Sequence, residues 1–272
     1  MYEIGLSTSG KSVCRDTFRM FSEAGIRFME VSLHHDDYPG IDYKMLKKWS
    51  EDSGVRLWSF HLPFTPFSSL DLSKKELCRE TVKYYCGMIE KASDIGIDKF
   101  VVHPSTEPID AAERHDRMEC SKESLFALAQ FAEKCGSVVA VEDLPRTCIG
   151  NSSDEILELL AAHKALKVCF DTNHLLGEDV CDFVRKVGKS IVTVHVSDYD
   201  FVDEKHWLPG EGKTDWYSLA AVLKNVGYNG VWMYEVPFEN TTKIQRSRNL
   251  TCDDFVRNAK EIFEGKELTV VK

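Results

Sequence analysis

The sequence lacks the features that mark secreted, membrane-spanning or phosphate-loop proteins. Its nine cysteines are odd in number and form no CxxC pair, so they predict free thiols, most of them buried, rather than a disulfide framework. No apolar run approaches the roughly 18 residues of a membrane span, and Met1–Ser9 has no signal-peptide pattern. Neither GxGxxG nor a GxxxxGK phosphate loop occurs. We therefore expect a cytoplasmic protein without a membrane partner.

Basic residues are scarce relative to acidic ones. The 272 residues include 34 Lys and Arg against 44 Asp and Glu, which gives a formal net charge of −10. A nonspecific nucleic-acid or anionic-membrane surface needs clustered Lys and Arg, so this balance disfavours both partners. Hydrophobic residues make up 43% and charged residues 29%, a composition typical of a globular protein that can bury a large core.

Short strand-like runs alternate with longer helical patterns along the whole chain. The predicted strands are Ile4–Ser7, Phe28–Leu33, Val55–His61, Lys99–His103, Ser137–Glu142, Lys167–Phe170, Ser190–His195 and Gly230–Val236. Each is followed by a helical pattern, and glycines punctuate the return to the next strand. Eight such units without a linker favour a closed α/β barrel over an open sheet. We predict one (β/α)8 TIM-barrel domain over residues 1–272.

Capping signals set the expected starts and ends of several helices. The first helix should span about Ser12 to Ala24. Ser73 with Glu76 three residues later has the capping-box pattern and predicts the start of the third helix. Ser153 is expected to cap the fifth helix, whose inner face would carry four apolar residues, Ile156, Leu157, Leu159 and Leu160. Asp215 should cap the seventh, and the last should span Cys252 to Glu264.

Polar side chains end six consecutive predicted strands. They are His61, His103, Glu142, Asp171, His195 and Glu235, and the loop after the seventh strand adds Glu204, His206 and Glu211. A lone histidine at a strand end is usually a hydrogen-bonded structural residue, but barrel closure aims all six side chains toward one mouth. Carboxylates gathered there would repel one another unless a cation lay between them. The joint pattern therefore predicts a divalent-metal site.

Other acidic and histidine residues near these strand ends receive different predictions. The spacing of Asp171 and His174 fits two side chains on one face of a first helical turn, so both can reach the mouth. Glu30 is expected to support the metal ligands from behind. Asp143 and Asp198 alternate away from the inward residues, which predicts structural roles.

The motifs around these residues resemble those of the xylose isomerase-like barrel superfamily. This group includes sugar epimerases, hydroxypyruvate isomerase, inosose dehydratase and endonuclease IV-type repair enzymes. The resemblance covers nearly the whole chain and rests on seven motifs: FHLPF at 60–64, VVHPS at 101–105, VED at 141–143, FDTNH at 170–174, VHVSD at 194–198, HWLPGEG at 206–212 and YEVP at 234–237.

The resemblance implies a metal held by Glu142, Asp171, His195 and Glu235. Mn²⁺ is the foremost expectation, with Mg²⁺, Co²⁺ and Zn²⁺ as alternatives. It also implies a sugar isomerase or epimerase of carbohydrate metabolism, in which Glu142 and Glu235 exchange protons with the substrate through a metal-stabilised enediolate. His174 would position a substrate oxygen, and Glu211 would orient a ligand or close the site.

Two other functions remain open. An endonuclease IV-type trinuclear centre acting on abasic DNA would need further ligands, for which the chain offers His61, His103, His174, Glu204 and His206. Its pattern has Asp where this chain has Glu204, and the acidic charge disfavours a DNA groove. A noncatalytic sugar- or metal-binding barrel is the third hypothesis. The sequence leaves a homo-oligomer open.

The loops suggest contacts for a carbohydrate. Phe64, Phe67, Trp207 and Phe238 follow strand ends and could stack on a sugar face, or could equally pack within the rim. The basic segment Gln245–Arg248 could receive a phosphate, although a solvated basic loop is the commoner explanation.

Overall fold

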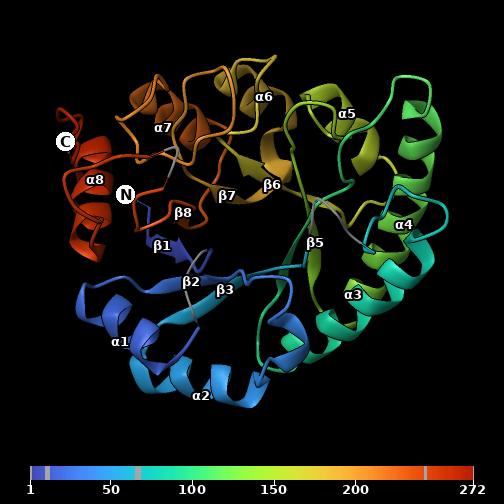
Figure 1. The fold of residues 1–272 in the computed structure, drawn as a ribbon, viewed down its shortest axis with the longest axis horizontal. Helices are drawn as coiled ribbons and strands as arrows, with labels where there is room; N and C mark the ends of the chain where they lie inside the picture. The colour runs from blue at the N-terminus through green and yellow to red at the C-terminus, as the bar shows by residue number, and fades with distance from the viewer. Residues whose placement is uncertain (1, 10–12, 65–68, 242–243, 272) are drawn as a thin grey trace.

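Parallel strands form the centre of the computed structural model, which describes residues 2–9, 13–64, 69–241 and 244–271 (Figure 1). The strands are β1 (Ile4–Ser7), β2 (Phe28–Val31), β3 (Arg56–His61), β4 (Lys99–Val102), β5 (Val138–Glu142), β6 (Lys167–Asp171), β7 (Ile191–His195) and β8 (Trp232–Tyr234). The strand order runs from β7 back to β1 and then to β8. Val196 N donates to Met233 O at 2.8 Å and Glu235 N donates to Val196 O at 3.1 Å, which joins β7 to β8. The predicted (β/α)8 barrel is confirmed.

Helices surround the strands as a ring (Figure 1). They are α1 (Arg15–Glu23), α2 (Tyr43–Ser53), α3 (Cys78–Ser93), α4 (Arg114–Lys134), α5 (Ser153–Leu160), α6 (Val180–Val187), α7 (Trp216–Asn225) and α8 (Cys252–Glu264), with short 3-10 helices η1 (Tyr38–Gly40) and η2 (Gly188–Ser190). The core lies between this ring and the strands. Phe170 of β6 stacks on Phe183 of α6 at 5.2 Å between ring centroids.

The interior of the barrel has an apolar layer below a polar layer. Side chains two positions apart on a strand face the same way. Val101, Ala140 and Cys169 form one buried cluster, and Phe28, Val231 and Met233 form another. Two positions further along the chain stand Glu30, His103, Glu142, Asp171 and Glu235. The lower layer thus fills the barrel, and the upper layer brings acids and imidazoles to the carboxyl ends of the strands.

Gly5 of β1 makes room for this filling. A Cβ at this position would lie 2.7 Å from both Met233 Cε and Val231 Cγ1. Those side chains fill the lower part of the barrel, which a larger residue in β1 would obstruct.

Several predicted helix boundaries are confirmed and others are wrong. The Asp215 cap and the span of α8 are confirmed. Helix α3 begins at Cys78, not Ser73, because Ser73 instead donates to Asp71 and accepts from Arg117. The cap of α5 is Ser152, one residue earlier than expected, and Leu157 is 41% exposed rather than on the inner face. Helix α1 begins at Arg15, while Ser12 lies outside the described residues.

The thiols are free, as expected, but fewer are buried than predicted. Cys148, Cys169, Cys181 and Cys252 are buried, and the other five are half-buried. The helix face explains the difference, since Cys78, Cys86 and Cys120 lie on partly exposed faces of α3 and α4, whereas Cys181 and Cys252 lie on the buried faces of α6 and α8. Among the helices of the described residues, none is both long and apolar enough to cross a membrane.

Candidate metal centre

Four predicted ligands meet at the mouth of the barrel. Each of Glu142, Asp171, His195 and Glu235 offers a donor atom, and these atoms all lie within 4.8 Å of one another. His195 Nδ1 lies 2.9 Å from Glu142 Oε1, 3.4 Å from Glu235 Oε2 and 3.7 Å from Asp171 Oδ2. All four residues are buried. The barrel therefore gathers side chains from β5, β6, β7 and the end of β8 around one point.

Hydrogen bonds behind the cluster fix the orientation of His195. Its Nε2 donates to Glu30 Oε2 at 3.0 Å, and Glu30 in turn accepts from Ser59 Oγ at 2.7 Å. In the metal-free protein Nδ1 donates to Glu142 Oε1 at 2.9 Å, and a bound cation would take the place of that proton. A carboxylate behind the imidazole is the usual support of a metal-binding histidine. Glu30 thus lies where the sequence predicted, behind the cluster.

The Asp171 carboxylate has one oxygen bound and one free. Its Oδ1 accepts from Asn173 N at 2.7 Å, while Oδ2 is buried without a hydrogen-bond partner among the described residues. A buried carboxylate oxygen without a partner is costly. Because Oδ2 lies on the side of His195 Nδ1, a divalent ion held by three carboxylates and one imidazole would satisfy it. The residues present therefore fit the metal that the sequence implies.

The two glutamates have opposite electrostatic environments. Burial opposes ionisation of Glu142, but His195 and His103 hold its pKa well below the ordinary value. Burial raises the pKa of Glu235 to about 7, and nearby Asp171 and Glu142 add to that increase, while His195 and His206 counter it. Without a metal, Glu142 is thus the ionised carboxylate and Glu235 titrates near neutrality.

A second group of donors adjoins Glu142. His61 Nε2 and His103 Nε2 each lie 3.0 Å from Glu142 Oε2. His61 Nδ1 donates to Leu62 O at 2.8 Å, which leaves Nε2 to face the carboxylate. Phe64 stacks on the His103 ring at 4.1 Å and is 41% exposed. It therefore stands at the open edge of the mouth.

A third group comprises His174, Glu204 and His206. Glu204 Oε1 lies 3.0 Å from His206 Nε2 and 3.7 Å from His174 Nε2. The Nδ1 atoms of both histidines donate to main-chain carbonyls, His174 to Asp143 at 2.8 Å and His206 to Glu235 at 3.2 Å. Helix α6 begins only at Val180, so Asp171 and His174 do not share a helical turn as predicted. A turn still brings His174 Nδ1 to 3.8 Å from Asp171 Oδ2.

Arg146 is a residue of this region that the sequence did not single out. Its guanidinium donates to Glu107 at 2.8 Å, Asp203 at 2.8 Å and Glu204 at 2.9 Å, and so joins the loops after β4, β5 and β7. Arg146, Phe201 and His206 have positive φ angles of 53°, 63° and 54°. Such backbone strain often accompanies functional sites. No spacing rule reveals these ion pairs, because their partners are far apart in the sequence.

Glu211 and Arg246 form an ion pair whose side chains are 14% and 1% exposed. Arg246 Nε donates to Glu211 Oε1 at 2.7 Å, and Arg246 Nη2 donates to Oε2 at 2.8 Å. Glu211 Oε2 also accepts from Leu208 N at 2.7 Å, within the loop that carries His206. Arg248 pairs with Asp254. Both arginines of the basic segment thus have acidic partners, so this segment is not a ready phosphate site.

Three of the four aromatic candidates lie in different environments, and Phe67 lies outside the described residues. Phe64 is at the mouth, as described above. Trp207 is half-buried and pairs through its main chain with Asp198. Phe238 is 5% exposed and packs against Phe255 of α8, so it offers no open face for stacking. Asp198 accepts from Gly210 N and Gly212 N at 2.9 Å each, which is the structural role expected for it.

Comparisons with known proteins find one barrel family and several relatives similar to this chain. A family model described as xylose isomerase-like TIM barrel matches residues 18–253. An uncharacterized protein of Methanocaldococcus jannaschii is 26% identical over 180 residues, which cover 63% of this chain and 61% of that curated relative. The D-psicose 3-epimerase of Ruminiclostridium cellulolyticum is 26% identical over 216 residues, or 74% of this chain and 70% of the epimerase. A solved D-tagatose 3-epimerase-like protein shares the fold, with a TM-score of 0.81 and 23% identity over 97% of both chains.

Proposed function

Because the chain belongs to the xylose isomerase-like TIM barrel family, we propose that it is a metal-dependent sugar isomerase or epimerase. The observation that carries this proposal is the convergence of Glu142, Asp171, His195 and Glu235 at the mouth, with an unsatisfied Asp171 oxygen facing the shared point. The named relative that acts on D-psicose adds a substrate class, the ketohexoses.

The proposed ligands are Glu142, Asp171, His195 and Glu235, and the proposed ion is Mn²⁺. When bound, the ion would polarise neighbouring carbonyl and hydroxyl oxygens of a sugar and so acidify the C–H bond between them. Three oxygen donors and one imidazole suit Mn²⁺, Mg²⁺ or Co²⁺ better than a structural zinc site. Glu30 would hold His195 in the tautomer that ligation needs, since it accepts the Nε2 proton.

Glu142 and Glu235 are the proposed proton-transfer groups. They come from β5 and the end of β8, which are not neighbours in the barrel, so their carboxylates approach the site from different sides. Removal of a proton from one face of a carbon and its return to the other inverts that centre. His174 would donate to a substrate oxygen from its position beside Asp171, and Phe64 would cover one side of the mouth.

The test is a turnover assay in D2O with protein that has been stripped of metal and reloaded with Mn²⁺. We expect D-psicose or another ketohexose to be converted, with deuterium appearing at the carbon next to the carbonyl, as detected by NMR. The metal-free protein should be inactive. The proposal fails if Mn²⁺-loaded protein converts no ketose or hydroxy-keto acid, or if product forms without solvent deuterium.

A second candidate is an endonuclease IV-type phosphodiesterase with three metal ions. One observation favours it: His61, His103 and Glu142 form one donor group and His174, Glu204 and His206 form another, and both adjoin the central four. The net charge of −10 and the acidic partners of Arg146, Arg246 and Arg248 weigh against a DNA-binding groove. Cleavage of an abasic-site duplex by protein with three ions per chain, without sugar turnover, would select this candidate.

A further inference from the structure

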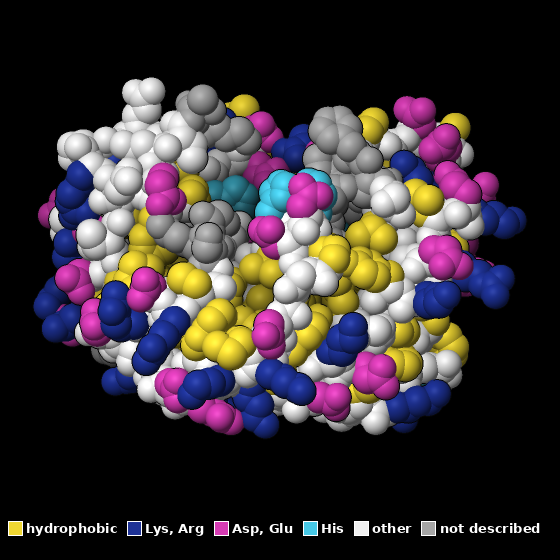
Figure 2. Space-filling model, turned by 60° about the horizontal axis from the view of Figure 1, so that its bottom comes forward, with side chains coloured by type: hydrophobic (Ala, Val, Ile, Leu, Met, Phe, Trp, Pro, Cys, Tyr) yellow, Lys and Arg dark blue, Asp and Glu magenta, His cyan; other side chains and the backbone are white. Residues whose placement is uncertain are grey.

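A second cluster of metal-binding residue types lies at the surface, outside the groups at the mouth. His34, His35 and Asp36 follow β2 in sequence and have side chains that are 64%, 46% and 77% exposed. Figure 2 shows exposed histidine side chains beside acidic ones in the upper middle of that face of the molecule. The loop that carries the cluster leaves the carboxyl end of β2, so it belongs to the same rim as the mouth.

A turn gathers the three side chains. Asp37 N donates to His34 O at 2.9 Å, which closes a β-turn over residues 34–37. The loop is anchored on both sides of the turn by Tyr38, which is 3% exposed. Its hydroxyl donates to His61 O at 2.7 Å and accepts from Leu33 N at 3.2 Å. These hydrogen bonds fix the backbone on either side of the turn, while the His34, His35 and Asp36 side chains face solvent.

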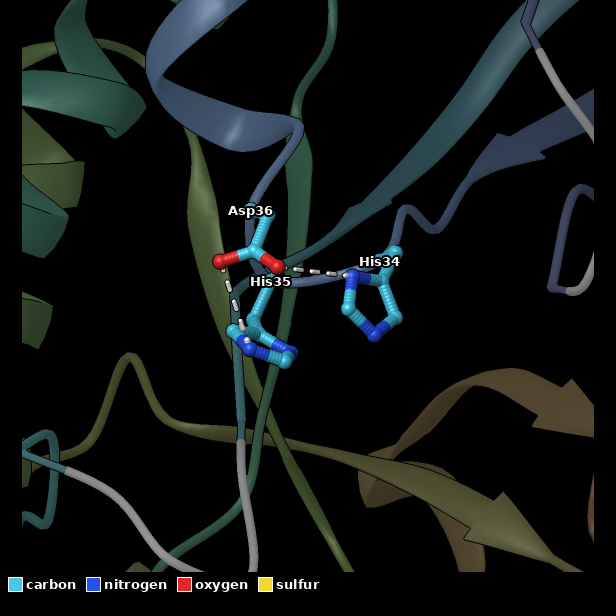
Figure 3. Close-up of side chains that lie close together, drawn as sticks. All are labelled: His34, His35 and Asp36. Atoms are coloured by element: carbon cyan, nitrogen blue, oxygen red, sulfur yellow. Dashed lines mark ion pairs between the residues drawn. The ribbon is translucent and has the colours of Figure 1, made fainter.

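The donor atoms already lie close to metal-site spacing. His34 Nδ1 is 3.6 Å from Asp36 Oδ2, and His35 Nε2 is 3.4 Å from Asp36 Oδ1. Figure 3 shows both imidazole rings on the side of the Asp36 carboxylate, with a dashed line to each. Donors bound to one tetrahedral Zn²⁺ at about 2.0–2.2 Å stand roughly 3.3–3.6 Å apart. One donor atom from each of the three residues lies within 4.8 Å of the other two, so small side-chain rotations bring them onto one ion.

Competing interactions at Asp36 are weak. Both imidazole contacts exceed the usual 2.7–3.2 Å of an N–H···O hydrogen bond. Within the described ranges, no lysine or arginine forms an ion pair with Asp36. The neighbouring Asp37 is exposed as well and adds negative charge. A metal ion at Asp36 would therefore displace no lysine or arginine of these ranges.

We propose that His34, His35 and Asp36 form an exchangeable site for a divalent transition metal of the Zn²⁺ class. Two imidazoles and one carboxylate select Zn²⁺, Ni²⁺ or Cu²⁺ over Mg²⁺, because the latter prefers oxygen donors. Three protein ligands leave the fourth position to water. The site differs in this from the carboxylate-rich cluster at the mouth, and it is independent of the function proposed for that cluster.

The test measures zinc at the cluster itself, so that ions at the mouth do not interfere. Diethyl pyrocarbonate modifies free imidazoles, and mass spectrometry of the 34–35 peptide reports the rate. We expect Zn²⁺ to slow modification of His34 and His35, and Mg²⁺ to leave the rate unchanged. In Asp36→Asn, half-protection should need at least about 10-fold more Zn²⁺. Exposed His115 of α4 is the internal control, whose modification should not respond to zinc.

A stoichiometry measurement completes the test. Zinc titration of metal-stripped protein should show one fewer ion per chain in the double variant His34→Gln/His35→Gln than in the His115→Gln control. The proposal is overturned if Zn²⁺ gives His34 and His35 no more protection than His115, or if the double variant binds as many zinc ions as the control. Each variant alters exposed side chains, so circular dichroism should show an intact fold in all of them.

Discussion

The cluster at the mouth and the cluster at residues 34–36 combine the same side-chain types in opposite environments. At the mouth, Glu142 has imidazole nitrogens at 2.9–3.0 Å and is 1% exposed. At the surface, Asp36 has them at 3.4–3.6 Å and is 77% exposed. Burial makes each charge at the mouth depend on its partners, whereas water can replace either partner of Asp36. Residue types alone therefore indicate where a metal ion could bind. Burial determines how strongly the charges of that site affect catalysis and the stability of the fold.

The largest expected effect concerns the proton-transfer groups at the mouth. Glu142→Gln keeps the size of the side chain but removes both a metal ligand and a base, so we expect kcat/KM for the ketohexose to fall about 10²–10⁴-fold. Glu133→Gln is the matched control, because Glu133 lies 3.6 Å from His163 on the surface of α4 and is 44% exposed. Its activity should match the parent protein. Equal activity in the two variants would remove Glu142 from the mechanism.

The second-largest expected effect is the loss of thermal stability when the metal is removed from the mouth. If Mn²⁺ binds the folded chain at a free concentration of about 100 times Kd, it adds about 2.7 kcal/mol of stability. For a chain of this length that corresponds to an increase of about 5–10 °C in Tm. Asp171→Asn should abolish the Mn²⁺-dependent increase, because Asp171 Oδ2 is the unsatisfied donor at the shared point. Differential scanning calorimetry with and without a chelator checks this, and an unchanged increase in Asp171→Asn would place the ion elsewhere.

The pH dependence of Tm in the metal-free protein is the next expected effect in size. Burial lowers the pKa of His206, but Glu204 and nearby acids raise it to about 9 in total. A raised imidazole pKa contributes stability that is complete below the unfolded value of about 6.5 and is lost as pH rises toward 9. We expect Tm to fall between pH 6.5 and 9, and the fall to be smaller in His206→Gln. The exposed variant His34→Gln should keep the parent slope. Identical slopes in all three proteins would contradict the assignment.

The sequence predicted the barrel and its polar rim well, because both follow from short-range patterns. The alternation of strands and helices fixes the topology, and period-two alternation places Glu142 above Ala140 and Asp171 above Cys169. It failed where a side chain chooses among distant partners. Ser73 has a capping-box neighbour in sequence, yet Asp71 and Arg117 hold it instead. The ion pair of Glu211 with Arg246, which comes from another loop, was likewise not predicted, and the role of Glu211 toward a ligand stays a prediction.

Arg146 and the surface cluster depend on tertiary contacts that the sequence does not predict. The carboxylates that pair with Arg146 are 39 to 58 residues away in sequence, and no local sequence pattern predicts these ion pairs. His34, His35 and Asp36 are adjacent and easily seen, but only the turn closed by Asp37 brings their donors together. Local sequence thus predicts which residue types occur and which face of a strand or helix they occupy. The tertiary structure determines which distant residue each side chain contacts.

The smallest expected effect is on the stability of the metal-free protein. His61 is 1% exposed, and its ring links Leu62 O to Glu142 at 2.8 and 3.0 Å. His61→Gln should leave buried groups unpaired and lower the free energy of unfolding by about 1–3 kcal/mol. His34→Gln, at a ring that is 64% exposed, should change it by less than about 0.5 kcal/mol. Urea denaturation at pH 7 in chelator measures both losses, and equal losses would mean that burial does not separate the two clusters.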